Sequence, residues 1–259
     1  MIMRHILGLI IFFSLGCNGQ TNEQELSKLK GSEETNPPKE QSYLKSLSEL
    51  KLSSDTAKNY DQVKRSIKKL QQDLRQVDLS KDSIRVLFQT SLLNRIIPFW
   101  EGTTWSFEGH TARPQDGEIA CGYFVSTTLK HVGVNLNRYR LAQQNPLNEA
   151  KTLALGAEMI EVSEHSVEEN SSAIKKLIQE GIYFIGFDQS HVGYLLKEKD
   201  ELYLIHSNYI DSKGVEIEHI NESDVFSSYN RFFIVAISTN NTLLEYWLSG
   251  KEVVVITKD

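Results

Sequence analysis

The sequence predicts an α+β domain in which helices come first and an antiparallel sheet follows. Within residues 60–77, apolar side chains recur at intervals of three and four, which is the spacing of one helix face. Short apolar and aromatic runs begin later at Ile182, His191 and Leu202 and are typical of buried strands. The charged residues 197–201 separate the last two runs, so these runs are predicted to form an antiparallel hairpin.

Composition narrows the class of protein. Hydrophobic residues make up 40% of the 259-residue chain, which is enough for a globular core. The 28 Lys and Arg residues against 34 Asp and Glu residues give a formal net charge of -6, and no basic block is present. This balance argues against nucleic acid as a partner. No apolar run reaches the roughly 18 residues that a membrane-spanning helix needs.

The first 16 residues are predicted to be an export signal. Arg4 is followed by a short apolar run, as in a secretory signal peptide. The sequence Ser14-Leu15-Gly16-Cys17 resembles a bacterial lipobox. That resemblance implies cleavage before Cys17, a lipid on its sulfur, and a protein anchored to a membrane and facing the periplasm or the cell exterior. An ordinary signal peptide with an incidental Cys17 is the alternative.

The rest of the chain divides into three predicted parts. Residues 17–41 are polar and are predicted to be a flexible tether. Residues 42–98 form a helical segment, in which a helix over 84–96 is expected to end at Pro98. Residues 99–259 form the main domain, and residues 135–172 within it are interpreted as a long polar loop.

Cys121 is predicted to lie in the first turn of a helix. An apolar stripe follows it, and Gly133 is a natural helix end. Because free N–H groups and the helix dipole favour negative charge there, we expect a lowered pKa and a nucleophilic thiolate. The alternative is an inert, buried cysteine. Export and lipidation of Cys17 would leave Cys121 without a disulfide partner.

The hairpin is predicted to bring two imidazoles together. His191 opens one strand and His206 closes the next, so they lie close to opposite each other. A neutral imidazole can accept a thiol proton, and a polar partner on its second nitrogen fixes the ring. His206 is the expected partner, with Asn208 as a substitute. A zinc site is a less favoured reading, because no Cys-x-x-Cys or His-x-x-x-His spacing occurs.

The end of the chain is predicted to complete the sheet. Residues 231–237 form a strong strand pattern. A short helix over 242–248 and a last strand over 253–256 are expected after it.

Several motifs in their joint order resemble the NlpC-type cell-wall cysteine endopeptidases, which are papain-like hydrolases. The motifs are Gly102-Thr-Thr-Trp105-Ser-Phe-Glu-Gly109, Pro114, Gly117, Cys121-Gly-Tyr-Phe-Val125, His191-Val-Gly-Tyr-Leu and Ile205-His206. The resemblance covers about half the chain, from residue 100 to 238. It implies a papain-like fold with Cys121 as nucleophile, His191 as general base and then acid, and His206 as the orienting residue.

Two positions depart from the family pattern. Trp105 stands where the family often has a tyrosine that helps hold the oxyanion, and it offers only an indole N–H. Gly122 stands where the family often has serine. Arg138 and Arg113 are candidates for binding a substrate carboxylate, although a solvated surface role is favoured for both.

The resemblance implies hydrolysis of an amide through a thioester, most often in the stem peptides of peptidoglycan. It implies no metal and no organic cofactor. An amidase or acyltransferase on the same scaffold, acting on a substrate outside the wall, is one alternative. A catalytically inactive lipoprotein that binds a partner is the other.

Overall fold

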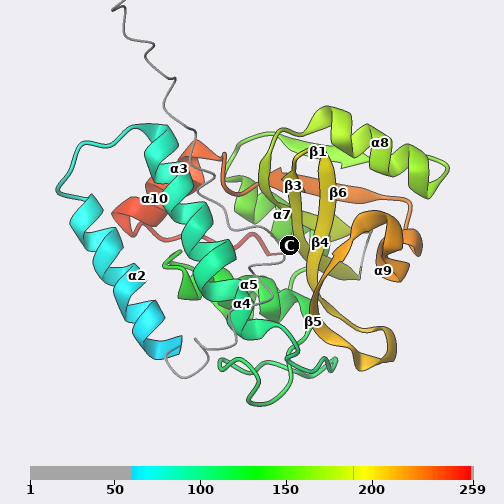
Figure 1. Cartoon of the computed structure of the whole chain (residues 1–259), viewed down its shortest axis with the longest axis horizontal. Helices are drawn as coiled ribbons and strands as arrows, with labels where there is room; N and C mark the ends of the chain where they lie inside the picture. Colours follow the sequence, from blue (N-terminus) through cyan, green and yellow to red (C-terminus); the bar gives the residue numbers. More distant parts are fainter. Residues whose placement is uncertain (1–59, 189, 258–259) are drawn as a thin grey trace, which may run out of the picture. The chain divides into compact units, whose positions relative to one another are not determined.

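The computed structural model describes residues 60–188 and 190–257, and six strands of this region form one antiparallel sheet (Figure 1). The strand order is β1-β6-β2-β3-β4-β5. The strands are β1 (Met159–Val162), β2 (Gly181–Phe187), β3 (His191–Glu198), β4 (Glu201–Asn208), β5 (Gly214–His219) and β6 (Phe232–Ala236). Every neighbouring pair is antiparallel, so the predicted α+β class with helices packed on an antiparallel sheet is confirmed.

Helices cover both faces of this sheet. They are α2 (Tyr60–Leu74), α3 (Lys81–Thr90), α4 (Ile97–Trp100), α5 (Cys121–His131), α6 (Arg138–Ala142), α7 (Pro146–Ala154), α8 (Val167–Leu177), α9 (Asp224–Ser227) and α10 (Asn241–Ser249). In Figure 1, α2, α3 and α10 lie on the side away from α8 and α9. One apolar core contains residues of α2, α3, α5, α7 and α10 and packs on one face of the sheet. A second core contains residues of α8 and α9 and packs on the other face.

The alternation of side chains along the strands sends neighbouring residues to different cores. Val192 and Tyr194 of β3 belong to the core shared with α5, whereas Leu195 belongs to the core under α8. Strands buried on both faces read as continuous apolar runs, which is why β2 shows no polar alternation.

Several predicted elements are confirmed. The stripe within 60–77 forms α2, the 231–237 pattern forms β6, and the 242–248 pattern forms α10. The hairpin turns at Lys199 and Asp200, which both have positive φ.

The expectation that Pro98 ends its helix is wrong by two residues. The chain passes from α3 into a π-helical stretch, Ser91–Ile96, and then into α4, where Pro98 occupies the first turn. Backbone N–H groups of a first turn need no intrahelical partner, so the missing N–H of proline is tolerated there.

The interpretation of residues 135–172 as a loop is also wrong. The segment contains α6, α7, β1 and the start of α8. Its polar residues Asn137, Asn145 and Ser166 are N-caps, and each accepts a hydrogen bond from the backbone N–H three residues later. The polar character therefore marks helix starts.

The strand expected over 253–256 does not form. Val253 makes a single bridge to Leu136, and Val253 and Val255 are buried while Val254 is 73% exposed. The alternation seen in the sequence thus reflects an extended segment that packs on the core without a neighbouring strand.

A buried polar contact fastens α2 to the C-terminal end of α5. The Tyr60 hydroxyl accepts a hydrogen bond from Trp100 Nε1 at 2.7 Å and donates to His131 Nδ1 at 2.9 Å. Burial lowers the pKa of His131 to about 4, so its ring is neutral and can accept. Residues 60–98 therefore share the core of the domain that follows.

We expect Tyr60→Phe to lower the free energy of unfolding by about 1–3 kcal/mol, because it leaves a buried indole N–H and an imidazole nitrogen without a partner. Urea unfolding at neutral pH measures this. Tyr203→Phe is the matched control, since the Tyr203 hydroxyl forms no hydrogen bond within residues 60–188 and 190–257. Equal losses in both variants would contradict the role given to Tyr60.

Candidate active site

Cys121 is the first residue of α5, as predicted. Ala120 before it is extended and caps the helix without a side-chain bond. The backbone N–H groups of Val192, Gly122 and Cys121 itself act on the sulfur and favour its ionised form. Val192 follows His191 at the start of β3, and both residues line the same cavity as Cys121.

The expectation of a lowered thiol pKa is wrong. The pKa of Cys121 is raised to about 11, chiefly by burial, and the nearby backbone N–H groups only partly oppose this shift. The side chain keeps partial access to solvent. Loss of hydration therefore outweighs the helix dipole, and the free protein holds Cys121 as a neutral thiol at neutral pH.

His191 and His206 are joined directly. His191 Nε2 lies 2.8 Å from His206 Nδ1, and the two rings are perpendicular with centroids 5.0 Å apart. The pair is buried, His191 being 1% and His206 0% exposed. A Cβ atom at Gly193 would lie 2.9 Å from the Cβ of His206 and 3.0 Å from the Ile205 carbonyl oxygen, so glycine there lets β3 and β4 approach closely beside His206.

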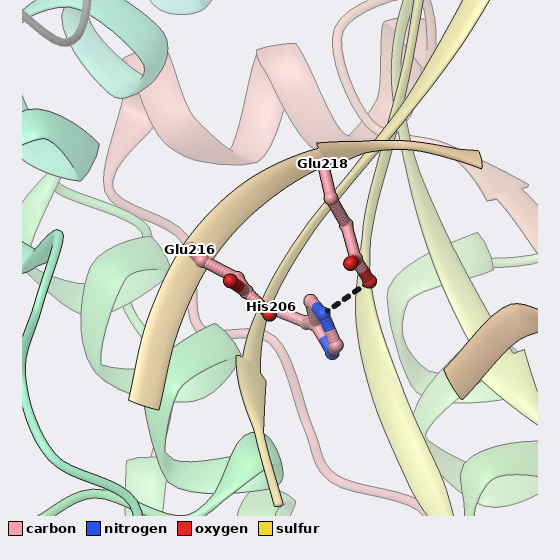
Figure 2. A group of neighbouring side chains, drawn as sticks. All are labelled: His206, Glu216 and Glu218. Carbon is pink, nitrogen blue, oxygen red and sulfur yellow. Dashed lines mark hydrogen bonds and ion pairs between the residues drawn. The ribbon is translucent and has the colours of Figure 1, made fainter. Parts of the chain in front are cut away.

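Glu218 of β5 continues this chain (Figure 2). Its Oε1 atom lies 3.0 Å from His206 Nε2. Although burial opposes ionisation, hydrogen bonds from His206 and Ser223 hold the pKa of Glu218 below its usual range. Glu218 is therefore a carboxylate at neutral pH.

This carboxylate fixes both rings. His206 donates its Nε2–H to Glu218, so in the neutral ring Nδ1 is an acceptor. His191 then donates its Nε2–H to His206, which leaves its own Nδ1 unprotonated. Burial, and then the neighbouring His206, lower the pKa of His191 well below its ordinary value, so its Nδ1 is a free base at neutral pH.

Cys121 and His191 both line one cavity of about 660 Å³. Its apolar walls include Trp105, Phe107, Tyr123, Tyr209 and Tyr229. In residues 60–188 and 190–257, no hydrogen bond joins the Cys121 sulfur to His191. In enzymes without substrate, nucleophile and base are often not hydrogen-bonded and come together only around the bound substrate.

Trp105 lines this cavity, and its ring lies 6.2 Å from that of Tyr209. Asn208 does not line it: its Oδ1 accepts from the Ile210 N–H at 2.8 Å, and its Nδ2 donates to Glu216. Asn208 therefore stabilises its own turn.

The two arginines also lie away from the cavity walls. Arg113 is exposed and pairs with Asp116 at 3.7 Å. Arg138 is 5% exposed and donates to the carbonyl oxygens of His110 and Thr111 and to the Thr127 hydroxyl. It thus fastens the loop before α5 to that helix.

Sequence reasoning missed Glu218, Tyr209 and Glu149 as residues near the site. Glu218 lies in the alternating sequence Val215-Glu-Ile-Glu-His219. Glu216, two residues earlier, also follows an apolar residue, so the sequence does not distinguish the two glutamates. Tyr209 follows Asn208, and its ring centroid lies 5.4 Å from that of His191. In the pairing of β4 with β5, Glu216 lies opposite His206 and Glu218 lies opposite Leu204. Glu218 reaches His206 from the diagonal position, which strand pairing alone does not select.

One group in the described residues has metal-ligand geometry. Atoms of His206, Glu216 and Glu218 lie within 4.8 Å of one another. Both His206 nitrogens already form hydrogen bonds, to His191 and to Glu218, and Cys121 is not part of the group. The geometry therefore favours a hydrogen-bonded relay over the zinc reading.

The predicted signal 1–16, the tether 17–41 and Cys17 lie outside the described residues. Among the residues that are described, no helix has the length and hydropathy needed to cross a membrane. Comparison with family models, with curated proteins and with solved structures found no match to this chain.

We expect alkylation of Cys121 by iodoacetamide to be slow at pH 7 and to rise up to about pH 11, because only the thiolate reacts. Mass spectrometry of the Cys121 peptide measures the rate at each pH. A short peptide with one cysteine, alkylated in parallel, provides the reference thiol. A plateau for Cys121 at or below the ordinary cysteine pKa, roughly 8.5, would contradict the assignment.

Proposed function

We propose that this protein is a cysteine hydrolase in which Cys121 attacks an amide carbonyl and His191 is the base. The observation that carries the proposal is the Glu218–His206–His191 chain, which leaves one ring nitrogen of His191 unprotonated, while His191 and Cys121 line the same cavity. A buried relay of this kind aligns a ring and stabilises its protonated form. A papain-like arrangement of the domain is part of the same proposal.

The mechanism follows from the neutral state of both groups. As Cys121 Sγ bonds to the carbonyl carbon, its proton passes to His191 Nδ1 and the carbonyl oxygen becomes an oxyanion. The backbone N–H of Cys121 and the indole N–H of Trp105 are the donors expected to receive it. His191 then gives the proton to the leaving amine, and a thioester remains. Water activated by His191 hydrolyses the thioester and restores the thiol.

The imidazolium formed in this step is stabilised at a distance. His206 relays the positive charge of His191 to the Glu218 carboxylate through two hydrogen bonds of 2.8 and 3.0 Å. The low dielectric of the buried chain strengthens both bonds as charge develops. Glu218 is thus a positioning residue that acts through His206.

Peptidoglycan stem peptides are the proposed substrate. The support is the resemblance of the motifs around Cys121 and His191 to the cell-wall endopeptidases, together with the export signal and the lipid anchor at Cys17 proposed from the sequence. The aromatic walls of the cavity suit the apolar parts of a peptide.

We expect purified sacculi incubated with the full chain to release new peptide fragments, and Cys121→Ala to release none. Mass analysis of the soluble fraction measures this. Cys17→Ala is the control, because it removes a thiol that lies outside the described residues. Intact sacculi together with cleavage of another amide would indicate a substrate other than the cell wall. No cleavage of any amide would favour the catalytically inactive lipoprotein that binds a partner.

We expect Glu218→Gln to lower the rate of cleavage by about 10²–10⁴-fold, because a neutral amide no longer fixes the tautomer of His206 or stabilises the imidazolium. Initial rates over a range of pH and the unfolding temperature are measured together. Glu216→Gln is the matched control on the same strand, since Glu216 binds Asn208 and not His206. Equal rates in the two variants would contradict the relay.

A further inference from the structure

A carboxyl group other than that of Glu218 lies beside the nucleophile. Glu149 comes from α7 and lines the cavity together with Cys121. It is 2% exposed, and its Oε2 atom is buried without a hydrogen bond in the part of the chain that the structure describes. A buried polar atom without a partner is costly, so its retention calls for an explanation.

Gly122 makes room for this carboxyl group. A Cβ atom at position 122 would lie 3.2 Å from Glu149 Oε1 and 2.9 Å from the carbonyl oxygen of Ala142. A serine after the nucleophile, as in the resembled family, would therefore crowd Glu149 and the chain at Ala142. Glycine in place of serine at position 122 therefore goes together with a carboxyl group at position 149.

The cavity walls have the composition of a site for positive charge. Two carboxyl groups, those of Glu149 and Glu108, line the cavity, and no lysine or arginine does so among the residues described. Aromatic rings form much of the remaining wall, and the faces of such rings attract cations. A bound ammonium group would meet a carboxyl group below it and aromatic rings around it.

We propose that Glu149 forms the floor of a subsite for a protonated nitrogen group, an ammonium or a guanidinium, carried by the substrate next to the bond that Cys121 attacks. The inference rests on the proposed function, because it treats the cavity as the substrate site. Binding would give the buried carboxyl group of Glu149 a charge-assisted hydrogen bond.

Binding would change the protonation of Glu149. Burial raises the pKa of Glu149 well above its usual range, which favours the protonated acid in the free protein. A bound cation favours the carboxylate, and the carboxyl proton would then leave to solvent.

The test uses thiol reagents of one size and different charge on the full chain carrying Cys17→Ala, so that Cys121 is the reacting cysteine. The probes are 2-aminoethyl, 2-hydroxyethyl and 2-sulfonatoethyl methanethiosulfonate, which are cationic, neutral and anionic. In each reaction a disulfide forms to Cys121, the sulfur–sulfonyl bond breaks and methanesulfinate leaves. Each rate for Cys121 is divided by the rate of the same reagent with a small free thiol. The corrected rate of the cationic reagent is then divided by that of the neutral reagent, and this ratio is compared between the parent protein and its variants. A change in the reactivity of the thiol itself affects both rates equally and cancels.

We expect the ratio to exceed unity by about tenfold or more, with the anion slowest, and Glu149→Gln to remove most of this preference. Glu149→Met, with an apolar side chain of similar length, is a second variant in case glutamine disturbs folding, and unfolding temperatures are measured for both. Glu108→Gln is the matched control, because Glu108 lines the same cavity but is exposed.

Three results would overturn the inference: a ratio near unity in the parent protein, a ratio unchanged by both Glu149 variants, or an equal loss in Glu108→Gln. Failure of Cys121 to react with any of the three reagents would also overturn it, since the cavity would then not admit molecules of this size. Sacculus cleavage that depends on Cys121, without any preference for charge, would leave the proposed function standing and remove only the subsite.

Discussion

The candidate site depends on a hydrogen-bonded chain that crosses three neighbouring strands. Glu218 on β5 holds His206 on β4, and His206 holds His191 on β3. The chain works only in one register, because a slip by one residue would turn a side chain to the other face of the sheet. The antiparallel pairing of β3, β4 and β5 therefore determines the tautomer of both rings and which nitrogen of His191 stays unprotonated.

Glycine at two positions leaves space for residues of the site. Gly193 leaves room for the Cβ atom of His206, and Gly122 leaves room for the carboxyl group of Glu149. Neither residue has an unusual φ, so backbone freedom is not the reason for glycine at these positions. What both positions require is the absence of a Cβ atom.

Much of this arrangement could be predicted from the sequence, because it follows from short-range patterns. The helix start at Cys121 and the hairpin that joins His191 to His206 both arise from periodicity and a turn. Glu218 and Glu149 could not be predicted in the same way. Glu218 depends on which strand pairs with β4, and Glu149 lies on a helix whose polar N-cap, Asn145, has the appearance of a loop residue.

The pKa of Cys121 was predicted wrongly for a similar reason. A helix N-terminus is visible in sequence, and it does stabilise negative charge by a modest amount. Burial beside Glu149 is visible only in three dimensions, and it acts on Cys121 in the opposite direction with greater effect. Proximity to a helix start is therefore weak support for a thiolate when the surroundings of the sulfur are unknown.

Three titratable groups at the cavity are neutral in the free protein, and one carboxylate behind them is charged. Cys121 and Glu149 keep their protons and His191 lacks one, all because burial disfavours the charged forms, while Glu218 is ionised by its hydrogen bonds. Charge at such a site appears only when a substrate or a transition state supplies the matching charge. The free protein thus avoids the cost of a buried thiolate–imidazolium pair, and the Glu218 relay offers its stabilisation at the moment when His191 receives a proton.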